Sequence, residues 1–367
     1  MRFIEKNLPW LLGTVALAAF SYYGLHKAEA AEWVGMNDHI NQTNFIVQVG
    51  ERGLCSGTLV ALKPKALILT ADHCVEDNIT VKETDETDPD DGTITKVKRE
   101  VYTDMKVKQV QYHEFTAVGT NEYTARIVAH AKKYDLALIE LRADSVPMTE
   151  YSHFLPEGMT VERGDPVMEV GNPLGMDATA AEGIVSSTTR MIVVGDQDDV
   201  PHPFYQVSAA TSPGNSGGAL YKVMADGSAY LIGVPAASII GYQGMGMVIP
   251  HTSIKKFLKE NCFDAVYDDK AKSHADCLKD KLDKENARRE KAGEPPLKPP
   301  TDDSVPLGLM PKETTTHLST LLQKPEKEAP KSDRQSCASA LGMAVSGYLA
   351  GKFDATTISP AIDACTK

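Results

Sequence analysis

The hydrophobic positions from residue 44 onward fall into short runs rich in valine, isoleucine and leucine, separated by glycine, proline and acidic residues. In the first half these runs cover 45–49, 55–60, 66–70, 107–110, 123–129 and 135–141. In the second half they cover 166–170, 183–187, 191–194, 205–209, 230–234 and 245–250. Short strands with frequent turns are typical of antiparallel barrels and sandwiches. The pattern therefore predicts an all-β region of two halves that meet near residue 150.

The segment from Asp77 to Asp91 departs from this pattern because it is acidic and rich in turn-forming residues. We expect it to form a solvated surface loop. Carboxylates are the hard oxygen ligands that Ca²⁺ prefers, so a calcium loop is the alternative. The ligand spacing of an EF-hand is not present in this segment, which disfavours that alternative.

The composition changes after a short predicted helix at 253–259. Residues 263–291 are rich in lysine, aspartate, glutamate and alanine, which favours an exposed, charged helix. Residues 292–333 contain repeated prolines and few apolar residues, which predicts an extended or disordered linker. Residues 334–367 include an apolar run of small residues, which predicts a short helical segment. We therefore expect a helical and partly disordered C-terminal extension.

Residues 1–30 have the layout of an export signal. Arg2 and Lys6 lie at a charged start, residues 8–25 are mostly apolar, and Ala28-Glu29-Ala30 has the small-x-small pattern of a cleavage site. The apolar run is near the shortest length that spans a membrane, so an uncleaved N-terminal anchor is the alternative. Either interpretation predicts a periplasmic or secreted protein that contacts a membrane only through this segment.

The six cysteines agree with export, because an even number in an exported chain indicates disulfides. Their spacing favours three local pairs, which are Cys55–Cys74, Cys262–Cys277 and Cys337–Cys365. A zinc site is the rival interpretation. No two cysteines have the CxxC spacing of such a site, so we expect neither a metal nor another cofactor.

Three segments carry candidate chemistry. They are Leu69-Thr70-Ala71-Asp72-His73-Cys74, Tyr134-Asp135-Leu136-Ala137-Leu138 and Pro213-Gly214-Asn215-Ser216-Gly217-Gly218. A serine hydroxyl is a weak nucleophile at neutral pH, so it needs a histidine to take its proton and a carboxylate to orient that histidine. The chain supplies these groups in the order His73, Asp135, Ser216. This order and context predict a serine protease.

These segments resemble those of chymotrypsin-fold serine proteases. The stretches GNPLG, EGIVSS and GMGMVIP make the chain most similar to the HtrA (Deg) branch. The resemblance covers residues 44–260 and implies a protease domain over 31–262, built from two six-stranded antiparallel β-barrels. HtrA proteins usually carry a PDZ domain after the protease, but no PDZ-like succession of strands follows residue 260, so we expect none.

The resemblance also implies a role for individual residues. Ser216 would be the nucleophile, His73 the general base and Asp135 its orienting carboxylate, with the N–H groups of Gly214 and Ser216 forming the oxyanion hole. Cys55 and Cys74 match the disulfide that lies next to the catalytic histidine in this family. Asn215 departs from the aspartate of digestive proteases, which pairs with a newly cut N-terminal amine, so activation by N-terminal cleavage is not expected.

The resemblance places an uncharged pocket for the side chain before the cut at Ala210, Ala236, Ala237, Ser238 and Gly246. A basic specificity would want a carboxylate at Ala210, so we expect small or medium apolar residues at that substrate position. The backbone of 236–238 should pair with the substrate as an added strand.

Protein or peptide substrates are the expected partners, and the oligomeric state stays open. The formal net charge of −12 argues against nucleic acid, since such binders usually show a basic patch. The alternative function is a catalytically silent pseudoprotease that grips peptides. An esterase of the α/β-hydrolase type is disfavoured because Gly214-Asn215-Ser216 lacks the GxSxG form and the triad order differs.

Overall fold

The computed structural model describes residues 36–50, 53–87, 94–113, 116–193, 201–238, 244–294 and 296–297. The predicted export signal, most of the proline-rich linker, and the C-terminal segment with Cys337 and Cys365 lie outside the described residues. In the part of the chain that is described, no helix has both the length and the apolar character needed to cross a membrane.

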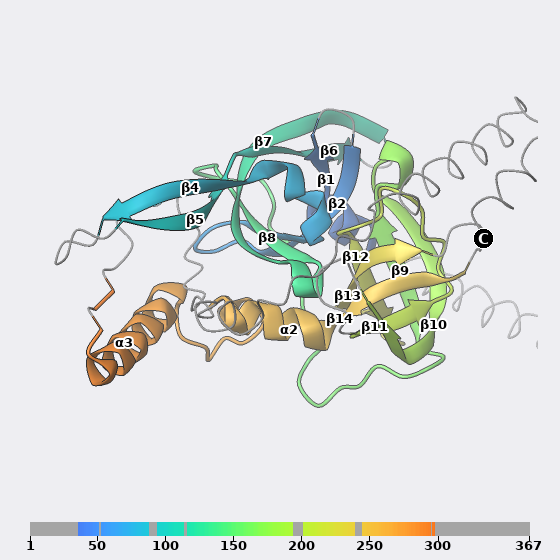
Figure 1. Ribbon diagram of the computed structural model, residues 1–367. Coiled ribbons are helices and arrows are strands. Elements are labelled where there is room, and N and C mark those ends of the chain that lie inside the picture. The colour runs from blue at the N-terminus through green and yellow to red at the C-terminus, as the bar shows by residue number, and fades with distance from the viewer. Residues whose placement is uncertain are drawn as a thin grey trace, which may run out of the picture. The chain divides into compact units, whose positions relative to one another are not determined.

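The first half of the chain forms a closed six-stranded barrel with the strand order β1-β2-β3-β8-β7-β6 (Figure 1). Its strands are β1 (Asn44–Val49), β2 (Gly53–Ala61), β3 (Leu67–Thr70), β6 (Met105–His113), β7 (Thr116–Ala131) and β8 (Leu136–Leu141). All neighbouring strands pair antiparallel. Alternate residues such as Phe45, Val47, Ile127 and Ile139 share one buried cluster, which is the period of two expected of a barrel interior.

The second half closes a further barrel in the order β10-β11-β14-β13-β12-β9. Its strands are β9 (Pro166–Gly171), β10 (Thr179–Ile192), β11 (His202–Val207), β12 (Ala219–Val223), β13 (Ala229–Ser238) and β14 (Gly246–Pro250). The prediction of two six-stranded antiparallel barrels is confirmed. The predicted run 183–187 and the first two residues of the run 191–194 prove to belong to one strand, β10, and its pairing with β11 shifts register between them.

A buried cluster of residues from both barrels holds them together. Leu69 and Leu138 of the first barrel share it with Val170 and Leu231 of the second. Phe257 joins the cluster from α2 (His251–Glu260), the helix that follows β14. The chemistry-bearing loops that lie between these strands are therefore fixed by a common core.

The expectation of a loop over residues 77–91 is wrong for most of that segment. Residues 79–87 form β4 (Ile79–Thr87), which pairs with β5 (Ile94–Tyr102) as a separate two-stranded sheet that extends from the first barrel (Figure 1). The reason is charge complementarity between the strands. The register sets Glu83 opposite Lys98, with an ion pair at 3.3 Å, and Asp85 opposite Lys96. Opposite charges across strands stabilise such a ribbon.

The charged segment after Cys262 contains α3 (His274–Ala292), and Leu278 is its buried residue. Ser273 caps the helix start by accepting a hydrogen bond from the Asp276 N–H at 3.2 Å, and Gly293 ends it in a left-handed conformation. A disulfide between Cys262 and Cys277 joins α3 to the end of α2. The exposed helix is thus tied to the barrel region through a covalent bond.

Candidate active site

His73 and Asp135 come from different turns of the first barrel and meet side by side. His73 lies in η1 (Asp72–Cys74), which follows β3, and Asp135 lies between η3 (Lys132–Tyr134) and β8. The His73 Nδ1 atom is 3.0 Å from each carboxylate oxygen of Asp135, and the His73 backbone N–H donates to Oδ1 at 3.1 Å. Asp135 is 6% exposed and adopts a left-handed backbone conformation, with φ at 52°, that aspartate tolerates better than most residues.

The surroundings of His73 favour its protonated form. Burial alone would lower the pKa of the imidazole. The hydrogen bond and the negative charge of Asp135, together with the charges of Glu76 and Asp72, outweigh burial and raise the pKa above its ordinary value. The imidazole side chain is still 41% exposed, so the ring is partly accessible from solvent. A histidine in this setting accepts a proton readily.

Ser216 lies in the loop of residues 211–218 between β11 and β12, called here the Ser216 loop. Each carbonyl from Ser212 to Ser216 accepts a hydrogen bond. Two of these come from Ser56 of the first barrel, whose Oγ donates to Gly214 O at 2.7 Å and whose N–H donates to Ser216 O at 2.8 Å. The N–H groups of Gly214 and Ser216, in contrast, have no acceptor among the residues that the structure describes. Two donors of the loop are therefore left for a ligand.

The loop needs glycine at position 217 because the two barrels approach each other there. Gly217 has φ at +83°, and a Cβ atom would lie 2.2 Å from Thr70 Oγ1 and 2.3 Å from Ser56 O. Any side chain would push the first barrel away from the loop. The close approach brings the Ser216 loop against η1, where Cys74 Sγ is 3.7 Å from Ser216 O.

The hydroxyl of Ser216 is turned toward the second barrel. Its Oγ donates to the carbonyl oxygen of Ala236 on β13 at 3.4 Å. No hydrogen bond joins Ser216 to His73, although both residues are described. The structure thus places His73 in direct contact with Asp135. It places Ser216 in a loop that lies against η1, the turn that carries His73.

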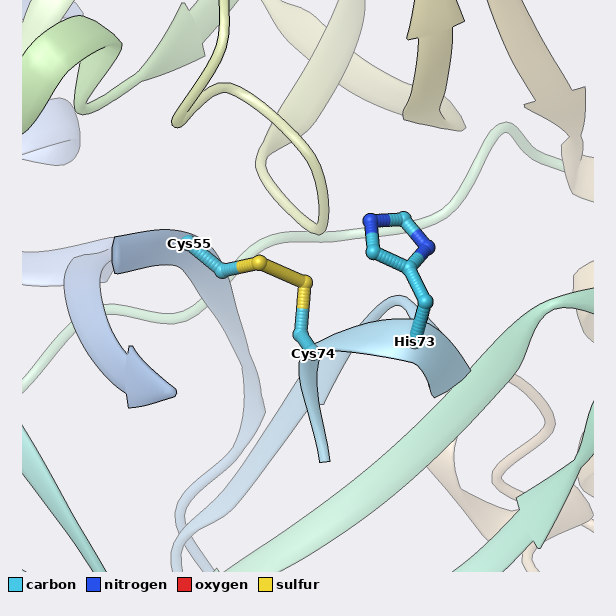
Figure 2. A group of neighbouring side chains, drawn as sticks. All are labelled: Cys55, His73 and Cys74. Carbon is cyan, nitrogen blue, oxygen red and sulfur yellow. A yellow bond between two sulfur atoms is a disulfide. The ribbon is translucent and has the colours of Figure 1, made fainter. Parts of the chain in front are cut away.

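A disulfide lies directly beside His73. Cys55 of β2 and Cys74 of η1 are joined, while the imidazole of His73 projects from the neighbouring position of the same turn (Figure 2). These three side chains lie close enough together to suggest a metal site. Their sulfur atoms are bonded to each other, so no thiolate is available as a ligand. The bridge fixes the backbone from which His73 extends.

The predicted pocket residues lie on, or just after, three neighbouring strands. Gly246 begins β14 and pairs with Val207 of β11 on one side and with Ser238 of β13 on the other. Ala236 and Ala237 lie on β13, and Ala210 is exposed just after β11. The pairing of β13 with β12 stops at Gly233. Along 236–238, the edge that faces away from β14 has no strand partner within the described residues.

Two buried carboxyl groups near this site are not singled out by the sequence pattern. Asp72, 1% exposed, accepts from His130 Nδ1 at 2.8 Å, and the other nitrogen of that imidazole is 2.8 Å from Glu100 of β5. Glu169 of β9, also 1% exposed, accepts hydrogen bonds from Thr211 and Asn215 in the Ser216 loop. A lone carboxyl inside an apolar β-run, Val167-Met168-Glu169-Val170, was the signal available in the sequence.

Comparison with known families gives a match over most of this region. Residues 55–234 match the family described as "Trypsin-like peptidase domain". A probable periplasmic serine endoprotease, DegP-like, from Chlamydia trachomatis is 33% identical over 143 residues, which cover 38% of this chain and 26% of that protein. A serine protease, HtrA-like, from Staphylococcus epidermidis is 26% identical over 249 residues, covering 62% of this chain and 40% of that one. The chain thus spans about a quarter to two fifths of the length of these relatives.

Among solved structures, the serine endoprotease from Yersinia pestis is similar at 22% identity with a TM-score of 0.42, covering 61% of this chain and 65% of that one. An HtrA-type protease solved with a tripeptide is similar at 23% identity with a TM-score of 0.41, covering 59% and 58%. No PDZ domain is found within the matched family region or the described residues.

Proposed function

Because the chain carries a trypsin-like peptidase domain with HtrA-like and DegP-like relatives, we propose that it is an exported serine endopeptidase. The observation that supports this most directly is the buried Asp135 carboxylate held 3.0 Å from His73 Nδ1. Export is supported by the signal-like layout of residues 1–30 and by the description of the Chlamydia trachomatis relative as periplasmic.

In the proposed reaction, Ser216 Oγ attacks the scissile carbonyl carbon while its proton passes to Nε2 of His73. Asp135 holds the Nδ1–H tautomer and stabilises the imidazolium. The oxyanion accepts hydrogen bonds from the Gly214 and Ser216 N–H groups, and each such donor typically stabilises the transition state by about 3 kcal/mol. His73 then gives the proton to the departing amine, which leaves an acyl ester on Ser216. A water molecule, deprotonated by His73, hydrolyses that ester.

The substrate would bind as an extended strand along the free edge of residues 236–238. The residue before the cut would enter the pocket bounded by Ala210, Ala236 and Gly246. These residues carry no charge, so small or medium apolar side chains should be preferred. A cleavage profile dominated by lysine or arginine would contradict this part of the proposal.

A peptide-binding pseudoprotease is the second candidate, and one observation favours it. The Ser216 hydroxyl is bonded to Ala236 O instead of His73. Hydrogen bonds between catalytic groups often form only when substrate is bound, and the oxyanion donors are already free, so the protease remains the better-supported proposal.

A fluorophosphonate probe separates the two candidates, because it reacts covalently only with a serine that its histidine activates. We expect the full chain to be labelled, with the adduct on Ser216 by mass spectrometry. Ser216→Ala should not be labelled and His73→Ala should be labelled far more slowly. A folded wild-type protein that is never labelled would support the binding module and overturn the protease.

A further inference from the structure

Glu169 is a carboxyl group in an unusual place, because it lies inside the second barrel. Along β9, Val167 belongs to the buried cluster of the barrel interior, and Glu169 has the same side-chain direction by the alternation of a strand. The strands on either side present apolar residues to it, with Ala181 of β10 and Leu220 of β12 in register. A carboxyl group in such surroundings is costly unless its oxygens are well bonded.

Both oxygens of Glu169 are bonded, and both partners belong to the Ser216 loop. Thr211 Oγ1 donates to Oε2 at 2.7 Å, and Asn215 Nδ2 donates to Oε1 at 2.8 Å. Thr211 begins the loop and Asn215 directly precedes Ser216. One carboxyl group therefore holds the two ends of the five-residue segment that carries the Gly214 N–H and leads to the Ser216 hydroxyl.

We propose that Glu169 is the positioning residue of the nucleophile, and that its ionised form, by accepting from Thr211 and Asn215, holds the Ser216 loop in the conformation that reacts. This inference rests on the proposed protease function and extends it. Asn215 cannot form an ion pair with an N-terminal amine, and the carboxyl group of β9 takes the place of such an external anchor. The conformation of the Ser216 loop is then held by a residue of the second barrel.

The direction of the two hydrogen bonds matters. A carboxylate can accept from both partners, whereas a protonated carboxyl group must donate from one oxygen. The Asn215 Oδ1 atom is buried without a hydrogen-bond partner among the described residues, so it is one acceptor for a protonated Glu169, and the Thr211 hydroxyl, which can also accept, is the other. Donation to Asn215 Oδ1 requires the Asn215 amide to turn, and donation to Thr211 reverses the direction of the Thr211 bond, so either change alters a contact that holds one end of the segment.

The ionisation of Glu169 depends on burial and on its hydrogen bonds with Thr211 and Asn215, because no charged group pairs with it in the described part of the chain. Within the described residues no ion pair involves Glu169. The ionisable side chains nearest in register are Glu182 on β10, which is exposed, and Lys222 on β12, which pairs with Asp165 at 2.7 Å. Burial raises the pKa of Glu169 to about 7, against the opposing hydrogen bonds from Thr211 and Asn215. Protonation would therefore occur around neutral pH.

The test compares the rate of fluorophosphonate acylation and kcat/KM across pH for the full chain and four variants. Glu169→Gln replaces one of the two acceptor oxygens with an amide donor, and Asn215→Asp sets two carboxyl groups together. Each should lower kcat by about 10- to 100-fold, the loss typical of breaking a hydrogen bond to a charged group, with little change in KM. The double variant Glu169→Gln with Asn215→Asp restores one donor facing one acceptor and should recover most of the rate. Glu182→Gln is the matched surface control and should not change it.

The wild-type pH profile is a second test that needs no variant. If Glu169 must be ionised together with a neutral His73, the acid limb should fall by about a hundredfold per pH unit, against about tenfold for one group. If the wild-type protein is labelled, but its acid limb follows one proton and both single variants keep full activity, the proposed role of Glu169 is overturned and the proposed protease is not. A wild-type protein that is not labelled would overturn the proposed protease. A folded double variant that stays as slow as the single variants would show a merely structural role.

Discussion

Asp72 and His73 are consecutive in η1, yet their side chains bind different partners. His73 faces Asp135, while Asp72 accepts from His130, which in turn contacts Glu100 of the β4–β5 ribbon. The buried carboxylate of Asp72 is one of the charges that raise the pKa of His73. The pKa of the imidazole proposed as general base is thus raised by two carboxylates, Asp135 and Asp72.

The acid limb of kcat/KM should therefore depend on Asp72. The pKa of His73 is raised above its ordinary value of 6.5, so activity should fall below a pH that lies above 6.5. Asp72→Asn removes a negative charge beside the imidazole and should move this limb to lower pH. The control is His130→Gln, which leaves the Asp72 charge in place and should not move the limb downward. The same downward shift in both variants would exclude a charge effect of Asp72.

The disulfide beside His73 should contribute to stability through the loop it closes. Cys55 and Cys74 are 19 residues apart, and a loop of this size corresponds to about 3 kcal/mol in the chain-entropy account. The double variant Cys55→Ala with Cys74→Ala should lower the free energy of unfolding by about this amount in a urea titration. Acylation should slow as well, because η1 loses its covalent tether. Unchanged stability would show that the bridge is dispensable.

Glu169 should make the protein less stable as pH rises. Its pKa is about 7 in the folded protein and about 4.5 when exposed. Between these values the unfolded chain has released the proton and the folded protein still holds it, so the free energy of unfolding falls with rising pH, by about 3 kcal/mol in total. Glu169→Gln lacks this titration. The stability difference between wild type and variant should therefore change by about that amount between pH 4.5 and 7.5, and a constant difference would contradict a buried, titrating Glu169.

Gly217 should tolerate no side chain. In Gly217→Ala the new Cβ would clash with Thr70 and Ser56 and would hold a left-handed backbone, which should cost about 2 to 4 kcal/mol and most of the activity. Gly158→Ala is the matched control, since Gly158 has φ at +88° with nothing within 4 Å of the added atom. It should lose only about 1 kcal/mol. Equal losses in thermal unfolding would show that the approach of the two barrels at Gly217 is not tight.

The barrels were predictable because their strands carry a local signal. Runs such as Phe45–Val49 and Leu136–Leu141 are β-rich wherever they pack. The β4–β5 ribbon was not predictable in this way, because the acidic β4 is stabilised by basic residues of another strand, and this pairing leaves no trace within either segment. The charges of this segment, considered alone, therefore predict a loop.

The residues of the candidate site likewise differ in whether the sequence carries a local signal for them. His73, Asp135 and Ser216 each lie in a recognisable segment, and the structure places His73 against Asp135, while the catalytic roles stay a prediction. His130 and Glu169 have no such segment. Their importance depends on partners 58 and 46 residues away, Asp72 and Asn215, and contacts at that separation are set by the fold.

The central claim is that Ser216 cleaves peptide bonds. The most direct measurement is cleavage of casein by the full chain beside Ser216→Ala, at a pH above the acid limb, with the cut sites identified by mass spectrometry. We predict that the wild-type protein cleaves, with small or medium apolar residues before the cuts, and that the variant does not. Equal cleavage by both proteins, or none by either, would contradict the claim.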